Sequence, residues 1–202
     1  MGRPTDPSPV LVVMAAFSRY PSALAWARQK AEALWGPVAL QSPFFLFDQT
    51  DYYAATMGRG LQKTFFAFQR LADPADLVNW KIATNAWETE YAAAAGHAEP
   101  RPLNLDPGYL TLGKLVLAST KDFAHRIYLS RGIYAEVTLS YQNRNWQSHA
   151  WTFADYRRAE YQDFLSRCRD YLHHELRRRR SSCMEVSGSR GSGPADCEGA
   201  ET

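Results

Sequence analysis

The feature that most constrains the fold of this chain is an uninterrupted apolar run, VLVVMAAF, at residues 10–17. A strand with one wet face alternates apolar and polar residues, whereas a strand covered on both faces is apolar throughout. The run therefore predicts a central strand with structure packed on both sides. It is far shorter than the roughly 20 apolar residues that cross a bilayer as a helix, so we expect no membrane span.

The first half of the chain continues with a helix and two more strands. Pro21 and Gly36 predict the two ends of a helix. Its apolar positions share one face at spacings of three and four: Leu24, Ala27, Ala31 and Leu34. Strands are predicted at residues 38–47 and 61–71, the first at a sheet edge or bulge because Pro43 cannot donate to a ladder.

A helix near residues 85–95 closes the first half. Asn85 with Glu88 three residues later is a variant of the capping box and predicts that the helix begins there. The apolar stretch at residues 77–82 either belongs to the same helix or stands apart from it, and the sequence leaves both readings open.

The second half reads in a similar order. A short strand is predicted at residues 102–105, a turn at Asp106-Pro107-Gly108, and a helix at residues 111–120 with Thr111 as its cap. Strands follow at residues 124–130 and 133–142, and then a long amphipathic helix at residues 155–178. The buried stripe of that helix is expected to be Tyr161, Phe164, Leu165, Cys168, Tyr171 and Leu172.

These elements predict an α+β fold, with a mixed sheet of about six strands and helices packed on it. The order also suggests two strand–helix–strand–strand–helix halves, although no residue-level repeat accompanies it. Residues 10–180 form one predicted domain. Residues 1–9 are polar, contain three prolines and no apolar segment of a secretory signal, and are expected to be flexible. Residues 181–202 are rich in Gly, Ser and acidic residues and are expected to be a disordered tail.

Charge and cysteine content narrow the partners and the compartment. The net charge is +2, and the densest basic cluster is the run of four arginines at residues 177–180. A nucleic-acid-binding domain spreads its basic surface over the fold, so nucleic acid is an unlikely partner. The three cysteines include no CxxC pair, which is typical of a reducing compartment and predicts a cytoplasmic location.

The register of the hairpin at residues 124–142 follows from its apolar face. A three-residue loop at residues 130–132 with a left-handed Gly132 places Ile127 opposite Ala135, whereas a two-residue loop mixes apolar and polar residues on each face. The three-residue loop also places Arg126 opposite Glu136 on the polar face. That pair is either an ordinary salt bridge on a wet face or the floor of a ligand site.

Several motifs identify the chain with a known family. They include residues 104–109 (NLDPGY), 114–122 (KLVLASTKD), 125–129 (HRIYL) and 132–136 (GIYAE). Shorter signatures are residues 50–53 (TDYY), 84–85 (TN), 151–152 (WT) and 155–157 (DYR). Residues 10–172 resemble the bacterial domain-of-unknown-function family numbered 4416. The resemblance implies membership and a bacterial origin, and it implies no activity.

Polar side chains gather near the predicted strand ends of the second half, where sites are commonly built. Lys, Arg and His together suit a phosphate or carboxylate ligand. The candidate ligand-binding residues are Asp106, Lys114, Lys121, Asp122, His125, Arg126 and Glu136, joined by Asp51 from the polar loop at residues 49–60. Each also has a simpler role open to it, in a turn, in solvent or at the sheet rim. No HxH or HExxH spacing is present, so no metal site is predicted.

Two functions remain open on these grounds. The first is an intracellular protein that binds a small anionic metabolite, phosphorylated or nucleotide-like, or an enzyme that acts on it. The second is a non-catalytic module that binds another protein through its aromatic surface. A cavity lined by the candidate residues favours the first, and a flat apolar patch with those residues dispersed favours the second.

Removal of the residues after Arg180 should leave the melting temperature nearly unchanged, because their composition gives them too little apolar surface to pack on the domain. Limited proteolysis followed by thermal denaturation checks this. A drop of several degrees in the trimmed protein would contradict it.

Overall fold

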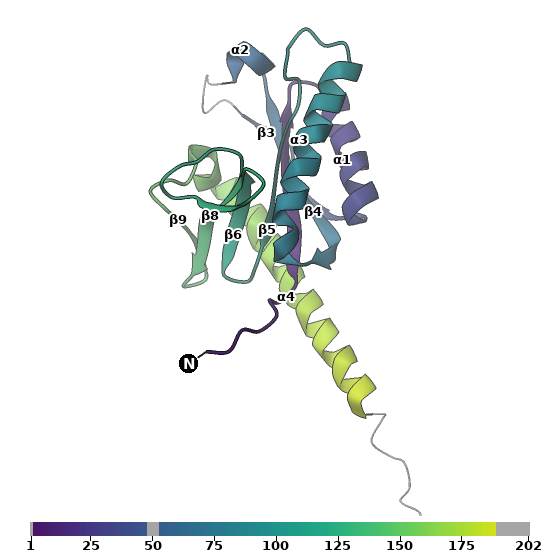
Figure 1. Cartoon of the computed structure of the whole chain (residues 1–202), viewed down its shortest axis with the longest axis vertical. Coiled ribbons are helices and arrows are strands. Elements are labelled where there is room, and N and C mark those ends of the chain that lie inside the picture. The colour runs from purple at the N-terminus through teal and green to yellow at the C-terminus, as the bar shows by residue number, and fades with distance from the viewer. Residues whose placement is uncertain (1, 48–52, 189–202) are drawn as a thin grey trace, which may run out of the picture.

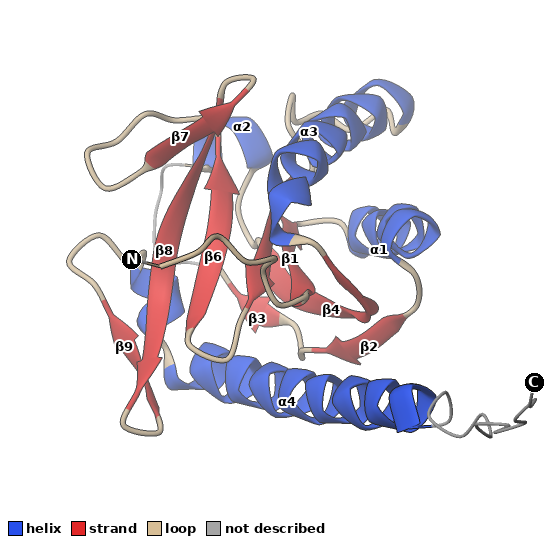
Figure 2. Ribbon diagram, turned by 60° about the horizontal axis from the view of Figure 1, so that its bottom comes forward, coloured by secondary structure: helices blue, strands red, loops and turns tan. Residues whose placement is uncertain are grey.

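The computed structural model describes residues 2–47 and 53–188, with side chains up to residue 181. A nine-stranded sheet forms the middle layer. Two helices, α1 (Pro21–Trp35) and α3 (Leu77–Ala94), cover one face, and the long helix α4 (Ala159–Gly188) crosses the other (Figures 1 and 2). This arrangement confirms the α+β class. No helix in the described part of the chain combines the length and apolar character needed to cross a membrane.

The sheet is antiparallel at each of its described pairings. Its strands are β1 (Val10–Ser18), β2 (Val38–Gln41), β3 (Phe45–Leu46), β4 (Gln62–Ala72), β5 (Asn104–Leu110), β6 (Lys114–Ser119), β7 (Ile127–Ser130), β8 (Ile133–Gln142) and β9 (Asn145–Ser148). The order is β2-β4-β1-β5-β6-β8-β7, with β3 beside β4 and β9 beside β8. The short helix α2 (Ala54–Met57) and the 3₁₀ turns η1 (Pro74–Asp76) and η2 (Ala154–Arg157) lie in the connections.

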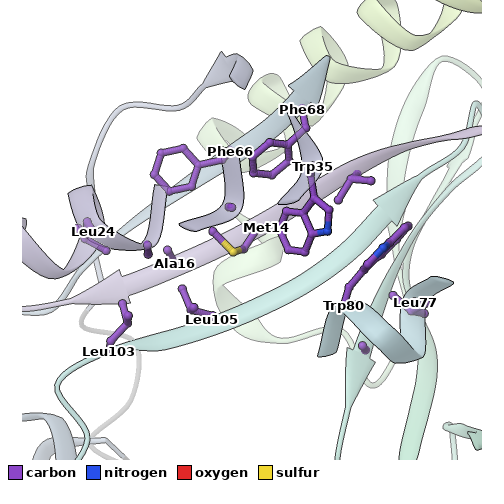
Figure 3. Packing of buried hydrophobic residues seen from close by; sticks show 14 of the residues in the cluster. Met14, Ala16, Leu24, Trp35, Phe66, Phe68, Leu77, Trp80, Leu103 and Leu105 are labelled. Carbon is purple, nitrogen blue, oxygen red and sulfur yellow. The ribbon is translucent and has the colours of Figure 1, made fainter. Parts of the chain in front are cut away.

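Strand β1 is central and buried along its whole length, as the apolar run predicts. Its alternate side chains enter two separate cores because successive residues of a strand point to opposite faces. Met14 and Ala16 pack beneath α1 and α3 (Figure 3), whereas Leu11 and Val13 pack beneath α4.

Helix α4 buries the expected stripe against the sheet. Tyr161, Leu165, Cys168 and Leu172 are fully buried there, and Tyr171 is partly buried. The helix continues past the expected boundary at Arg180 to Gly188, and the rest of the predicted tail lies outside the described residues. On α1, by contrast, Leu34 is exposed although it was placed on the buried stripe.

Two local predictions in the first half differ from the structure. The strand expected at residues 38–47 is two strands, β2 and β3, because Pro43 interrupts the pairing with β4. Helix α3 is continuous from Leu77, so Asn85 lies inside the helix and caps nothing. The carboxylate of Glu88 instead accepts a hydrogen bond of 2.7 Å from the backbone N–H of Leu105.

The largest difference lies at residues 104–119. Asp106-Pro107-Gly108 is part of β5 and pairs with β1, because strand pairing outweighs the local turn preference of these residues. The segment predicted as a helix is β6, since its four consecutive buried residues fit a strand covered on both faces. Thr111 caps a tight turn, in which its hydroxyl accepts the N–H groups of Gly113 and Lys114. The second half therefore has no helix between its first strands, and the two halves are not alike.

Gly108 is required where β5 and β6 pair. A Cβ at this position would lie 2.3 Å from the carbonyl oxygen of Val116, which is too close for any side chain. The close approach of the two backbones thus depends on this glycine.

The β7–β8 hairpin has the predicted register in its body, with Ile127 opposite Ala135 and Tyr128 opposite Tyr134. Its tip differs from the prediction. Ser130 pairs with Ile133, Arg131 and Gly132 both have positive φ, and the extra residue is accommodated by a bulge between Tyr128 and Ser130. All of β7 is exposed, so its apolar side chains do not join the core as expected.

Cys168 should resist thiol reagents in the native protein. Burial raises the pKa of its thiol well above the ordinary value, so the reactive thiolate is absent at neutral pH. In a variant with Cys183 and Cys197 replaced by Ser, labelling should be undetectable in buffer and complete in guanidinium. Rapid labelling in buffer would contradict the buried placement.

Candidate functional site

A cavity of about 460 Å³ lies at one end of the sheet, where β1 and β6 end and β4 and β5 begin. Its walls come from these strands, from β8, from η2 and from the loop after β6. The charged residues that line it are Lys63, Lys81, Arg101, Asp106, Lys121, Arg126, Glu136 and Asp155. The aromatic residues that line it are Phe17, Phe47, Tyr53, Phe123, Phe153 and Tyr156.

Part of this space exists because β5 and β6 separate. Their pairing runs from Leu110 opposite Leu115 to Gly108 opposite Leu117 and goes no further. The next residue of β5, Pro107, has no N–H to donate to a ladder. Lys81 of α3 reaches this opening, where its ammonium donates to the carbonyl of Leu105 at 2.8 Å and lies 3.4 Å from Asp106 Oδ1.

Lys63 and Asp155 form a buried ion pair in the wall beside η2. The Nζ–Oδ2 distance is 2.6 Å, and the two side chains are only 3% and 7% exposed. Aromatic rings surround the ammonium, the nearest being Tyr156, whose centroid lies 4.4 Å away. Burial and the nearby carboxylate of Asp155 raise the pKa of the Tyr156 hydroxyl well above its ordinary value, so this residue stays neutral.

Arg126 and Glu136 form the second buried pair. Arg126 Nε donates to Glu136 Oε2 at 2.7 Å, and the side chains are 3% and 1% exposed. The remaining carboxylate oxygen, Oε1, accepts from Thr138 at 3.1 Å. The predicted pairing of these two charges is confirmed. The interpretation that places the pair on a solvent-exposed face is wrong, because both side chains are buried. Arg126 precedes β7 in a turn that closes on Phe123, and this turn folds its side chain inward over the Phe123 ring.

A third polar network joins α3 to the start of β5. Arg101 donates to Glu88 at 3.1 Å and to the side-chain oxygen of Asn104, and Asn104 donates to Asp106 Oδ2 at 2.8 Å. Burial raises the pKa of the Glu88 carboxyl, an effect opposed by the nearby charges of Lys81 and Arg101. The network holds Asp106 and Asn104 in place at the cavity surface.

Four predicted site residues come together in the lining: Asp106, Lys121, Arg126 and Glu136. His125 is not part of the lining, but its Nε2 lies 3.2 Å from Glu136 Oε2 and its ring stacks on Trp151. Asp122 interacts with the hydroxyl of Tyr134, outside the lining. Lys114 begins β6 at the end away from the cavity. Asp51 lies outside the described residues.

The sequence prediction missed the half of the site that comes from the first part of the chain and from η2. The missed charged residues are Lys63, Lys81, Arg101 and Asp155. One signal was available, because a lysine in a strand as apolar as residues 61–71 must find a partner when it is buried. Among the described residues, no group of three or more His, Cys, Asp or Glu side chains is placed to hold a metal ion.

A comparison with known protein families identifies a match. Residues 8–171 match the model of a family described as domain of unknown function DUF4416. The chain belongs to this family. No curated protein and no solved structure matches it. The matched residues include the whole described lining of the cavity.

Replacement of Asp155 by Ala should lower the free energy of unfolding by roughly 3–5 kcal/mol, because it leaves the ammonium of Lys63 buried without a counter-charge. A double variant, Lys63→Met with Asp155→Leu, should lose less free energy of unfolding than the two single variants lose together. Urea denaturation measures both.

The matched control for this prediction is Glu90→Ala, which breaks the more exposed Lys30–Glu90 pair. That pair should contribute about 1 kcal/mol at most. A loss from Asp155→Ala no larger than that of the control would show that the buried pair does not stabilise the fold.

Proposed function

We propose that this protein binds a small anionic ligand, phosphorylated or nucleotide-like in its chemistry, in the cavity at the end of the sheet. The observation that carries the proposal is the charge of the lining, in which five cationic side chains face three carboxylates. A volume of about 460 Å³ lies within the range of pockets for small molecules and is too small for a folded domain.

The cations are held in fixed positions before any ligand arrives. Glu136 engages Arg126 through Nε, and the carbonyl of Lys121 accepts from Nη1 at 3.1 Å. The guanidinium retains further N–H groups, which a phosphate or carboxylate could accept. Lys121 extends this positive region from the loop after β6.

The apolar part of the lining supports a ligand with an organic body and an anionic end. Phe17, Phe47 and Tyr53 form one aromatic wall and contact one another. Phe153 and Tyr156 line the cavity from η2 and the residue before it. Rings of this kind bury apolar surface, while the charged groups fix orientation.

A second function, binding of another protein, is favoured by a different observation. Several large apolar side chains are exposed on β7 and on the loops beside the cavity: Phe123, Ile127, Tyr128, Leu129, Trp151 and Phe153. Ile127 is 71% exposed on a strand at the edge of the sheet. Exposed apolar edges of this kind commonly mark interaction surfaces. For either function we propose a cytoplasmic location, from the cysteine usage alone.

A thermal-shift screen against phosphorylated metabolites and nucleotides tests the ligand proposal. A ligand present at 100 times its dissociation constant stabilises the folded state by about 2.7 kcal/mol, which corresponds to roughly 5–10 °C for a domain of this size. Lys121→Ala should lower the affinity for each ligand found in the screen by about tenfold or more, because it removes a charge-assisted contact.

Lys114→Ala is the matched control, since it removes the same charge from the far end of β6. It should leave every thermal shift unchanged. Equal shifts in Lys121→Ala and the parent for every hit would refute the proposed site. Absence of any hit, together with loss of a protein partner in Ile127→Ser, would support the interaction module instead.

A further inference from the structure

One of the three carboxylates that line the charged cavity differs from the other two in its surroundings. The side chains of Glu136 and Asp155 are 1% and 7% exposed, and each is paired with a buried cation. The side chain of Asp106 is 32% exposed. Asp106 is therefore the carboxylate of the described lining that is most accessible to a ligand in the cavity.

Hydrogen bonds fix the orientation of the Asp106 carboxylate. The side-chain oxygen of the buried Asn104 accepts from the guanidinium of Arg101, a group that can only donate. The amide nitrogen of Asn104 therefore faces Asp106 and donates to Oδ2 at 2.8 Å. Lys81 Nζ lies 3.4 Å from Oδ1. An ionised carboxylate has about four acceptor positions, so both oxygens can accept a further donor from a ligand.

Asp106 lies on the same face of the sheet as Glu136, with one strand between them. Asp106 is opposite Ala15 of β1, and Glu136 is opposite Leu117 of β6. Residues opposite each other in a ladder point to the same face, and Ala15 and Leu117 both belong to the core beneath α4. Because β6 lies between β5 and β8, the backbones of the two acidic residues are about 10 Å or more apart. Arg126, which is bound to Glu136, therefore meets a ligand at a different point from Asp106.

The charge of Asp106 determines which ligand group it can bind. An ionised carboxylate only accepts hydrogen bonds, and it repels an anion. It therefore requires a donor on the ligand, either a hydroxyl or an ammonium group. The ammonium of Lys81 already balances the charge of Asp106, so a second ammonium would meet no uncompensated negative charge. Hydroxyl groups remain, and two neighbouring hydroxyls match the two carboxylate oxygens.

We infer that the ligand of this cavity is a phosphorylated compound with neighbouring hydroxyl groups, and that Asp106 determines this specificity. The hydroxyls donate to Oδ1 and Oδ2 of Asp106, and the phosphate accepts from the Arg126 guanidinium and from Lys121. Sugar phosphates and ribonucleotides share this chemistry. The inference rests on the proposed function of the same cavity, and it adds the class of ligand.

The first test compares matched compounds on the full-length protein by calorimetry at constant pH and salt. Adenosine 5′-monophosphate should bind about tenfold more tightly than its 2′,3′-dideoxy analogue, because the analogue lacks the two donors to Asp106. Ribose 5-phosphate should likewise bind about tenfold more tightly than 2-deoxyribose 5-phosphate. A preference within the first pair alone identifies a ribonucleotide ligand, and a preference within the second pair alone identifies a sugar phosphate.

The second test separates the hydroxyl contact from the anion contact. Asp106→Asn should lower the affinity for ribose 5-phosphate or adenosine 5′-monophosphate by about tenfold, because it weakens the acceptor of the hydroxyls. It should raise the affinity for sulfate by about threefold, because sulfate has no hydroxyl at neutral pH and the carboxylate only repels it. Glu90→Gln is the matched control, since Glu90 is an exposed carboxylate outside the lining, and it should change neither affinity.

Two results would overturn the inference and leave the proposed function standing, provided that Lys121→Ala weakens binding of the phosphorylated compounds. The first is equal affinity within both pairs of compounds. The second is an Asp106→Asn variant whose affinities for the hydroxylated phosphates and for sulfate do not change in opposite directions. Failure of every phosphorylated compound and of sulfate to bind would refute the anionic site itself, and the inference with it. If Asp106→Asn does not fold, the matched compounds on the parent protein still decide.

Discussion

The buried ion pair between Lys63 and Asp155 is the interaction on which the functional end of this molecule depends. It joins β4 to η2, two segments separated by 92 residues, at the point where the chain enters α4. An ammonium surrounded by aromatic rings requires a counter-charge, because burial removes most of the water that would otherwise solvate it. The pair thereby sets both the start of α4 against the sheet and one wall of the cavity.

The sheet is unusual among antiparallel sheets because helices cover both of its faces. Such sheets commonly leave one face to water. Here β1 sends alternate apolar side chains into two cores, one with α1 and α3 and one with α4. Over these central strands both faces are closed, and the cavity with the charged lining lies at the ends of the strands.

Local sequence patterns predicted the structure correctly wherever a single strong signal acted alone. The apolar run predicted β1, proline and glycine bounded α1, and the alternation of apolar residues predicted the pairing of Tyr128 with Tyr134. They were insufficient where distant pairing outweighed a local preference. Asp106-Pro107-Gly108 favours a turn in isolation, yet the ladder to β1 holds it extended. The same contrast holds for the site prediction. It found Arg126 and Glu136 because they share a hairpin, and it missed Lys63 and Lys81 because only distant packing brings them to the site.

The sequence by itself determined the α+β class, the central strand, the buried stripe of α4 and the neighbourhood of Arg126 and Glu136. These depend on periodicity and on contacts between residues close along the chain. Only the tertiary structure decided that β5 and β6 separate, that the side chain of Arg126 is buried, and that charges from α3, β4 and η2 meet in one cavity. The physical reason is that burial and ion pairing across 92 residues depend on the packed positions of whole elements, and no local pattern encodes them.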